Sequence, residues 1–491
     1  MADGQRRIPY AFAKEKGALP LDESADVVKV LVRPNAEVDG IAELRRVLAR
    51  PLSVEAVSAE QFASALAAAY NQGASEVAQI SEDLAREGGL AALLHELPSG
   101  EDLLAGEAEA PVIRMVNALL LQAVRDGASD VHLEAFEARS LVRFRIDGQL
   151  REVIEPPRAL HAALVSRVKI MASLDIAEKR LPQDGRITLR LGGRSIDVRV
   201  STLPTGQGER VVLRLLDKEA ARLDLEVLGF APATLTALDE LVRQPHGIVL
   251  VTGPTGSGKT TTLYAALSRL DRAHMNIMTV EDPIEYALDR VGQTQVNPRT
   301  ELTFARALRA ILRQDPDVIM IGEIRDLETA QIAVQASLTG HLVLATLHTN
   351  DAPSAITRLT DMGVEPYLLA SSLLGVLAQR LVRKLCPQCR VRHEASATEI
   401  ELLGDGGAPP VLHEAPGCTA CNQSGYRGRT GIYELLRVDA RVRELIHEGA
   451  GEAALRAHAI ECGWPSLRQD GQRWLAAGTT SLAELVRVTR D

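Results

Sequence analysis

A run of residues suited to holding phosphate stands at 253–260. It reads Gly-Pro-Thr-Gly-Ser-Gly-Lys-Thr and matches the pattern G-x-x-x-x-G-K-[ST]. An apolar, strand-like run at 246–252 precedes it, and a helix-like stretch at 260–270 follows. In this order of strand, glycine-rich turn and helix, several backbone N–H groups and the positive end of the helix dipole point at one place. A chance glycine-rich turn would lack these flanks, so the chain is predicted to bind a nucleoside triphosphate.

The positions of this loop have different expected parts in binding ATP. The glycines let the backbone approach the phosphates, Lys259 can reach the β- and γ-phosphates, and the Thr260 hydroxyl can ligate Mg²⁺. The residues expected to contact the nucleotide here are Gly253, Pro254, Thr255, Gly256, Ser257, Gly258, Lys259, Thr260 and Thr261.

Acidic residues and a histidine follow three further strand-like runs. The run at 277–285 is read as a strand that ends in Glu281, Asp282 and Glu285; the run at 317–322 leads to Glu323, and the run at 341–346 leads to His348. Ligands of an open parallel sheet bind beyond the carboxyl ends of its strands, so these side chains should face the phosphate loop. Acids there can hold magnesium and orient the attacking water, and His348 could sense the γ-phosphate. Singly, such an acid is more often a helix cap and such a histidine a local hydrogen-bond partner, but three edges together favour a site.

Four of the five cysteines form two pairs, Cys386-x-x-Cys389 and Cys418-x-x-Cys421. Two such pairs brought together give the tetrahedral thiolate ligation of a structural Zn²⁺ site. The segment between them looks loop-like, with Gly404, Gly406, Gly407, Pro409 and Pro410, and metal would supply the stability that it lacks. Redox pairs and plain buried thiols are the alternatives. Cys462 stands apart and is expected to be an ordinary core residue.

The composition sets limits on what these groups can serve. The chain has 491 residues, enough for two to four domains, and its 46% apolar content is ample for buried cores. A net charge of −10 and an aromatic content of 3% argue against a nucleic-acid partner. No apolar stretch is long enough to span a membrane, and the start lacks the apolar core of a secretory signal. We therefore expect a soluble, cytoplasmic protein that can still dock on a membrane complex.

The segments that must position these groups differ in pattern. Residues 58–71 read as an amphipathic helix with a Ser58–Gln61 capping box and a stripe of Phe62, Leu66 and Tyr70, which would face a small core or a partner's groove. Residues 98–111 read as a linker of small and acidic residues. A helix at 112–126 and strands at 141–146, 187–191 and 195–200 predict a small α/β domain that displays many arginines. After residue 228 the pattern alternates strand and helix, as in a parallel sheet with helices on both faces.

At this point the residues resemble a known family. Residues 251–262, 279–286 and 321–326, together with the stretch from 339 to 351, look like the four signatures of the secretion ATPases, which drive type II secretion and the extension and retraction of type IV pili. The tetracysteine insert after residues 379–385, the segment 203–216 and the opening at 8–14 resemble the type II secretion ATPase E family in particular.

The resemblance implies a multidomain α/β fold. It comprises an N-terminal docking domain and linker at 1–105, a PAS-like domain with arginine-bearing strands at 106–228, and a RecA-like P-loop ATPase domain at 229–380. A tetracysteine zinc-binding subdomain at 381–426 and a helical subdomain at 427–491 complete it.

The resemblance also implies a role for each candidate residue. Lys259 and Thr260 would bind the triphosphate and magnesium, Glu285 would polarise the attacking water, and Glu323 would be its partner or a ligand of a magnesium-bound water. Arg210 and Arg214 would complete the site as the smaller domain closes or from a neighbouring subunit; on the residues alone, a solvated basic edge remains the alternative.

The implied function is that of a cytoplasmic ATPase that powers type II protein secretion. It would act as a homohexamer attached peripherally to the inner membrane, through the cytoplasmic domain of an anchor protein and the platform membrane protein. A pilus-extension ATPase is the closest alternative, followed by a retraction ATPase. A scaffold that binds ATP without turnover and a nucleic-acid motor are the alternatives from other classes.

Overall fold

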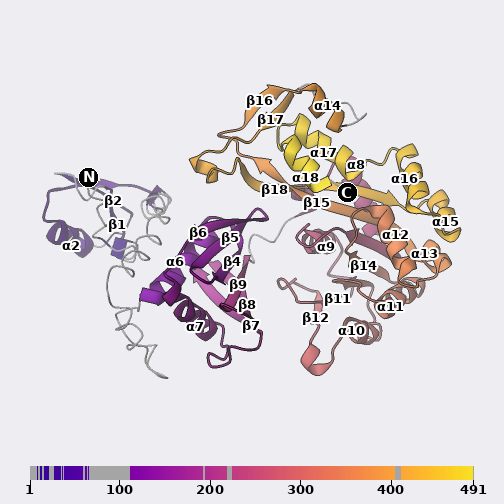
Figure 1. The fold of residues 1–491 in the computed structure, drawn as a ribbon, viewed down its shortest axis with the longest axis horizontal. Coiled ribbons are helices and arrows are strands. Elements are labelled where there is room, and N and C mark those ends of the chain that lie inside the picture. The colour runs from indigo at the N-terminus through magenta and orange to yellow at the C-terminus, as the bar shows by residue number, and fades with distance from the viewer. Residues whose placement is uncertain are drawn as a thin grey trace. The chain divides into compact units, whose positions relative to one another are not determined.

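The structure is a computed structural model that describes residues 8, 12–13, 16–21, 27–34, 36, 38–58, 61–62, 65, 111–191, 194–217, 224–403 and 411–489 (Figure 1). The predicted linker at 98–111 and the positions Leu66 and Tyr70 of the predicted stripe lie outside these ranges, apart from Pro111. Among the described helices, none has both the length and the apolar character needed to cross a membrane.

The N-terminal part is a small sheet with one helix. Strands β1 (Ala18–Pro20) and β2 (Val28–Val32) pair antiparallel, and β2 pairs parallel with β3 (Leu52–Ala56). Helix α2 (Val38–Leu48) connects β2 to β3, as a parallel pair requires. The predicted capping box is confirmed, because Ser58 and Gln61 each accept the other's backbone N–H at 3.1 Å. Phe62 is 3% exposed and packs in this core, which favours the core reading of the stripe at that position.

The next part is a six-stranded sheet in the order β6-β5-β4-β9-β8-β7. Its strands are β4 (Ala128–Ala135), β5 (Ser140–Ile146), β6 (Gln149–Ile154), β7 (Gln183–Leu191), β8 (Arg194–Thr205) and β9 (Gly208–Asp217). Helices α6 (Pro111–Arg125) and α7 (His161–Met171) contact β4, with the short helix η1 (Arg158–Leu160) before α7. The predicted helix and strands are confirmed, although β7 and β8 are longer than their apolar patterns.

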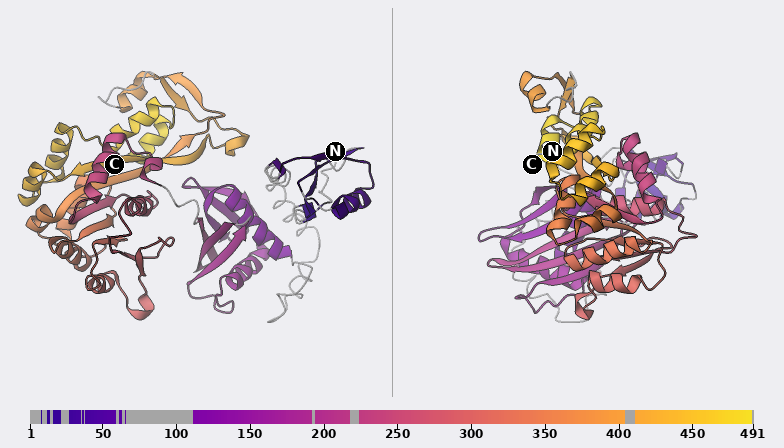
Figure 2. Two further views of the ribbon diagram at one scale, coloured as in Figure 1. Left: turned by 180° about the vertical axis from the view of Figure 1, so that it is seen from behind. Right: turned by 90° about the vertical axis from the view of Figure 1, so that its right-hand side faces the viewer.

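The part of the chain that contains the phosphate loop has a seven-stranded sheet in the order β12-β11-β13-β14-β10-β15-β18 (Figures 1 and 2). These strands are β10 (Gly247–Thr252), β11 (Ile277–Glu281), β12 (Gly292–Gln295), β13 (Val318–Ile321), β14 (Leu342–Leu347), β15 (Leu373–Leu385) and β18 (Tyr426–Arg437). All neighbours are parallel except β15 and β18. The predicted parallel sheet is confirmed, with an antiparallel edge that the pattern did not indicate.

Helices cover both faces of this sheet. Alternate residues of β10 point to opposite sides: Val249 and Val251 pack in one core with α8 (Pro232–Val242) and α9 (Lys259–Ser268). Ile248 and Leu250 pack in the other core. The helices on that side are α10 (Phe304–Ile311), α11 (Leu327–Leu338), α12 (Ala352–Asp361) and α13 (Pro366–Ser372), with short helices η2 (Leu225–Leu228) and η3 (Pro298–Thr300) elsewhere.

One predicted strand is too long. The run at 277–285 was expected to be a strand throughout, but β11 ends at Glu281. Pro283 has no N–H to donate, so it cannot continue a ladder in the interior of a sheet. Asp282 and Glu285 therefore lie beyond the strand, in irregular chain.

The C-terminal part continues from the long strands β15 and β18. It contains α15 (Ala440–His447), α16 (Glu452–Glu461), α17 (Leu467–Ala476) and α18 (Leu482–Thr489). Between β15 and β18 the chain forms β16 (Val391–Glu394), α14 (Ala397–Leu403), β17 (Val411–Glu414) and the short helix η4 (Thr419–Cys421). The prediction of a loop here was wrong, because β16 and β17 pair antiparallel. Gly404, Gly406, Gly407, Pro409 and Pro410 lie outside the described residues.

Candidate active site and metal centre

The phosphate loop joins the end of β10 to the start of α9, as the motif predicts. Gly253 (φ +149°), Gly256 (+80°) and Gly258 (+89°) take conformations that other residues rarely adopt. A Cβ atom at Gly253 would stand 2.5 Å from the carbonyl oxygen of Gln379, so only glycine fits there. Gln379 also donates its amide to the carbonyl of Ser257 at 2.7 Å, so a neighbouring strand fixes the loop from the side.

The predicted nucleotide ligands differ in exposure. Pro254, Thr255 and Gly256 are exposed at the tip, Thr260 and Thr261 are half-buried, and Lys259 is 9% exposed. The Lys259 ammonium donates to the carbonyls of Gly253 at 2.7 Å and Pro254 at 3.1 Å. Burial lowers the pKa of Lys259 to about 8, although the charge of Glu323 favours the protonated form.

Lys259 begins a chain of polar contacts along the carboxyl edge of the sheet. Its ammonium lies 3.4 Å from His348 Nδ1, and His348 Nε2 lies 3.0 Å from Glu323 Oε1. Glu323 Oε2 in turn accepts a hydrogen bond from Arg325 at 2.7 Å, and Arg325 lies 3.7 Å from Asp282. Burial and the Lys259 charge lower the pKa of His348 below its ordinary value, which favours the neutral ring. Three strand ends and the phosphate loop thus meet here, as the parallel-sheet rule indicates.

The loop that carries His348 is itself held in place. The Thr349 N–H donates to the hydroxyl of Thr252, the last residue of β10, at 2.9 Å. Asp351 caps α12 by accepting the Ser354 N–H at 2.9 Å, and its other oxygen accepts from Arg456 at 2.7 Å. His348 therefore stands on a loop that is fixed at both ends.

The remaining acids of the acidic box have different surroundings. Glu281 is 2% exposed and lies in a hydrogen-bond cluster: its oxygens accept from Thr279 at 2.5 Å, from Gln293 at 3.0 Å and from the hydroxyl of Tyr264. Tyr264 belongs to α9, so Glu281 ties the end of β11 to the helix that follows the phosphate loop. Glu285 is half-buried and lies close to Tyr264. Burial and Glu281 raise the pKa of the Tyr264 hydroxyl, while Glu285 has two smaller and opposite effects: its backbone hydrogen bond lowers this pKa and its charge raises it.

The two predicted arginines lie on β9 of the six-stranded sheet. Arg210 is paired with Glu134 at 2.6 Å, and Arg214 is paired with Asp130 at 2.9 Å. Both acids are on β4 and almost completely buried, while the side chains of Arg210 and Arg214 are 39% and 56% exposed. Alternation along β4 puts Val131 and Leu133 into the core and these acids on the opposite face. The arginines are thus anchored by buried carboxylates rather than freely solvated.

Sequence reasoning missed three residues at the carboxyl edge of the sheet beside the phosphate loop, which we call the P-loop edge. Arg325 joins two of the predicted acids; its signal was its place two residues after Glu323 in the same charged stretch. Gln379 and Arg380 lie on β15, more than a hundred residues after the phosphate loop, and Arg380 donates to Asn350 at 3.0 Å. Only the pairing of β15 with β10 brings this strand to the loop.

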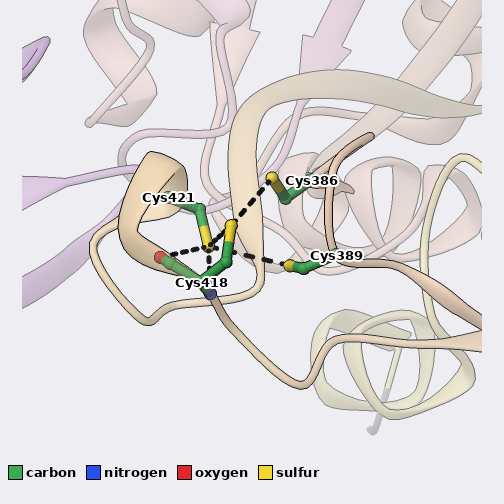
Figure 3. A group of neighbouring side chains, drawn as sticks. All are labelled: Cys386, Cys389, Cys418 and Cys421. Atoms are coloured by element: carbon green, nitrogen blue, oxygen red, sulfur yellow. Dashed lines mark hydrogen bonds between the residues drawn. The ribbon is translucent and has the colours of Figure 1, made fainter.

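The four paired cysteines come together in one cluster (Figure 3). Their sulfur atoms all lie within 4.8 Å of one another, with Cys386–Cys418 and Cys389–Cys421 at 3.9 Å and Cys418–Cys421 at 3.7 Å. Zinc–thiolate bonds of about 2.3 Å in a tetrahedron require sulfur separations of about 3.8 Å, so the donor set and its spacing fit Zn²⁺. Backbone N–H groups of Cys418 and Gly425 both point at the Cys421 sulfur at 3.2 Å, which stabilises a thiolate there.

The prediction for Cys462 was wrong. It is exposed rather than part of the core, and it lies beside His458 and Asp439.

Comparisons with known proteins agree on one family. The chain matches the family model "Type II/IV secretion system protein" over residues 105–487, and a model of an N-terminal domain of GSPII protein E over residues 7–70. It is 58% identical over 487 residues to Type II secretion system protein E of Pseudomonas aeruginosa, across 99% of this chain and 97% of that protein. It is 54% identical over 489 residues to Type II secretion system ATPase E of Vibrio cholerae, across 99% of this chain and 97% of that protein.

Solved structures agree at the level of the fold. The pilus retraction motor PilT with bound ADP superposes with a TM-score of 0.51 at 26% identity, across 76% of this chain and 96% of that one. The Legionella pneumophila ATPase DotB gives a TM-score of 0.58 at 19% identity, across 80% of this chain and 98% of that one, which shows a shared fold only. The resemblance drawn from the motifs is confirmed: relatives this similar along nearly the entire chain show that it belongs to the type II secretion system protein E family and is an ATP-hydrolysing enzyme of that secretion pathway.

Proposed function

We propose that the P-loop edge hydrolyses ATP, and that some of its residues bind ATP in the ground state whereas others act mainly in the transition state. Lys259, Thr260 and the loop N–H groups hold the phosphates, with Mg²⁺ at the Thr260 hydroxyl. Mg²⁺ held there would neutralise part of the charge of the phosphates. The observation that supports this best is the unbroken chain of contacts from Lys259 through His348 and Glu323 to Arg325.

His348 would couple binding of the γ-phosphate to the position of Glu323. In the present arrangement the Lys259 ammonium is satisfied by loop carbonyls and His348, and a phosphate would compete for it. Withdrawal of Lys259 from His348 would leave the histidine to Glu323 alone. The contact between His348 and Glu323 would then tighten as ATP binds.

Glu285 remains the preferred residue to polarise the attacking water, with Glu323 as its partner. Glu281 is less suited to this task, because Tyr264, Thr279 and Gln293 already occupy both of its oxygens. Asp282 and Glu281 would act at the edge of the nucleotide site rather than on the water.

The test compares ATP binding with turnover. Lys259→Ala should weaken binding and abolish turnover, whereas Glu285→Gln should keep binding and lower turnover by about 10²-fold or more. Glu323→Gln should also lower turnover, and Glu328→Gln, an exposed carboxylate of α11, is the matched control. Hydrolysis by Glu285→Gln at the wild-type rate would assign the water to Glu323.

We also propose that Arg210 and Arg214 complete the nucleotide site, as the domain closes or from a neighbouring subunit of a homohexamer. The buried acids Glu134 and Asp130 would hold them in position for this. Arg210→Ala should then lower turnover while ATP binding stays unchanged. A loss confined to the assembled ring would place the arginine in a neighbouring subunit, and an equal loss in the monomer would place it in the same chain.

The cysteine cluster would hold one Zn²⁺ in a structural role. All four ligands are protein thiolates, which leaves no open position for a substrate. Elemental analysis of protein purified without chelator should therefore find zinc bound to Cys386, Cys389, Cys418 and Cys421.

We propose a separate role for each part of the chain, as the family suggests. Residues 1–105 would dock on a partner, residues 106–228 would close over the nucleotide site, and residues 229–380 would hydrolyse ATP. Residues 381–426 would form a zinc-binding subdomain, and residues 427–491 a helical subdomain. The docking part would bind the cytoplasmic domain of an inner-membrane anchor, and the motor would act on a platform membrane protein from the cytoplasmic side. Deletion of 1–105 should preserve basal hydrolysis and abolish membrane association and secretion. Secretion by the truncated protein would refute the docking role.

A further inference from the structure

A second group of metal-binding side chains lies between α15 and α16, apart from the four paired cysteines. Asp439, His458 and Cys462 place one carboxylate oxygen, one ring nitrogen and one sulfur within 4.8 Å of one another. Asp439 precedes α15, and the other two residues come from the end of α16. None of them belongs to the P-loop edge.

The backbone explains why these side chains meet. His458 and Cys462 are four residues apart, and Cys462, the C-cap of α16, keeps helical dihedrals, so both side chains lie on one face of the helix. Asp439 is the N-cap of α15: its Oδ1 accepts the Val442 N–H at 2.8 Å, which fixes the carboxylate. The other oxygen, Oδ2, is thereby turned toward α16.

The contacts converge on a single nitrogen. Asp439 Oδ2 lies 2.8 Å from His458 Nε2, and Cys462 Sγ lies 3.4 Å from the same Nε2 and 3.9 Å from Oδ2. A nucleophile–base–acid relay would need a carboxylate hydrogen-bonded to the ring nitrogen that the thiol does not contact, and Glu461 Oε2, on that side of the ring, lies 4.0 Å from Nδ1, too far for a hydrogen bond. Three donor atoms around one point instead match ligands around an ion.

The distances suit a tetrahedral ion of zinc size. With bonds of about 2.0 Å to nitrogen and oxygen and about 2.3 Å to sulfur, the donor atoms would be separated by roughly 3.3 to 3.6 Å. The distance from Cys462 Sγ to His458 Nε2, 3.4 Å, lies within this range. The distance from Sγ to Asp439 Oδ2, 3.9 Å, has to shorten by about 0.3 Å, and the Asp439–His458 contact of 2.8 Å has to open by about 0.5 Å. A side-chain movement of that size is available because the Asp439 side chain is 45% exposed.

We propose that Asp439, His458 and Cys462 form a binding site for a divalent transition metal ion of the zinc class. Oxygen, imidazole and thiolate donors together select such an ion over Mg²⁺ or Ca²⁺. Binding displaces the Cys462 thiol proton to solvent, and the thiolate and the Asp439 carboxylate then neutralise the two charges of the ion. The fourth position faces solvent and takes water, so this ion exchanges readily, unlike one enclosed by four thiolates.

The test uses full-length protein, with its cysteine cluster filled with Zn²⁺ and with reductant present. Titration with Co²⁺ should show one further equivalent per chain, with a near-ultraviolet thiolate-to-cobalt band and visible bands of tetrahedral intensity. Cys462→Ala should abolish the thiolate band, and His458→Ala should weaken binding at least about 100-fold. Asp439→Asn keeps the helix cap and should weaken binding in the same direction. His447→Ala, an exposed histidine at the end of α15, is the matched control and should bind as wild type.

Competition with Zn²⁺ should displace the Co²⁺ and release no additional proton. ATP hydrolysis with Mg²⁺, and the melting temperature of protein that carries zinc in its cysteine cluster alone, should be the same for wild type and variants, which shows that a lost site does not reflect misfolding. The proposal is overturned if wild type takes up no ion beyond that of the cysteine cluster, or if Cys462→Ala and His458→Ala both bind Co²⁺ as wild type does.

Discussion

Replacement of Glu484 by glutamine should destabilise the base of the tetracysteine insert, the segment between β15 and β18 that carries the four paired cysteines. Glu484 on α18 is 1% exposed, and its oxygens accept the Arg383 N–H at 3.0 Å and the Arg383 guanidinium at 2.7 Å. Arg487 adds two hydrogen bonds of 2.8 Å. Arg383 belongs to β15, stacks on the Tyr426 ring at 4.0 Å and stands three residues before Cys386. The Glu484 carboxylate therefore joins the C-terminal helix directly to β15 and, through the Arg383 guanidinium stacked on Tyr426, to β18.

The magnitude follows from the pKa of Glu484. Burial alone would raise it, but the hydrogen bonds from Arg487 and Arg383 outweigh burial and lower it from 4.5 to about 2. Each pKa unit corresponds to about 1.4 kcal/mol, so the charged form stabilises the fold by about 3 kcal/mol at neutral pH. Because the pKa is lower in the folded state, this contribution is complete above pH 4.5 and disappears as the pH falls toward 2. Glu484→Gln also leaves Arg383 buried without its counter-charge, which keeps the expected loss near 3 kcal/mol.

The assay is urea unfolding at pH 7, followed together with zinc release to a chromogenic chelator. The variant should unfold about 3 kcal/mol more easily, with zinc released at a lower urea concentration. Arg487→Ala removes the partner that is 52% exposed and should cost about 1 kcal/mol or less. Glu448→Gln, an exposed carboxylate, should change nothing measurable. A loss below about 1 kcal/mol for Glu484→Gln, or zinc release at the wild-type urea concentration, would refute the reasoning.

Three other outcomes are expected. The pKa of Lys259 is about 8 without nucleotide, and a bound phosphate would raise it. ATP affinity should therefore be independent of pH below 8 and should fall up to tenfold per pH unit above 8, as titration of a fluorescent ATP analogue would measure. Lys259→Arg should not show this pH dependence. Cys418→Ser should lower the melting temperature and the zinc content while ATP binding, measured in the same titration, is kept, since the cluster and the phosphate loop are separate. Gly253→Ala should weaken ATP binding by tenfold or more, because its Cβ would clash with the Gln379 carbonyl. Gly340 also has a positive φ angle but has open space around it, so Gly340→Ala is the control and should bind ATP normally. Equal losses of ATP affinity in both variants would show that the clash is not the cause.

The sequence predicted those parts of the site that depend on local pattern or on a simple topological rule. The phosphate loop is contiguous, so its role was readable from 253–260 alone. His348 and Glu323 required only that their strands be parallel, because parallel strands end at the same edge. The sequence pattern overextended β11, because Asp282 and Glu285, which follow its last residue Glu281, were taken as part of the strand.

The parts that could not be predicted depend on tertiary packing. Gln379 reaches the phosphate loop only because β15 lies beside β10, and no pattern in either segment encodes that pairing. Cys462 was assigned to a core because its residue type is usually buried. It follows the buried Leu455 by seven residues and so shares its face of α16, but it stands at the C-cap of the helix and is exposed there. How far along a short helix a face stays covered is decided by its neighbours. The strands β16 and β17 are too short to show a period.

The pairing of Leu385 with Tyr426 in the ladder of β15 and β18 has a consequence for how this chain can vary. Everything between these two residues, from the first cysteine of the cluster to the last, leaves the sheet and returns to it at adjacent positions. In topological terms it is a single hairpin loop. The entropy cost of closing a loop grows only with the logarithm of its length, so an excursion of this size costs about 3 kcal/mol more than a two-residue turn. A chain in which a few turn residues join position 385 to position 426 would keep the strand register, so the sheet does not depend on the insert for its connectivity. What the deletion removes is packing, because β17 contacts α17 and Leu412 is buried in the core that α17 shares.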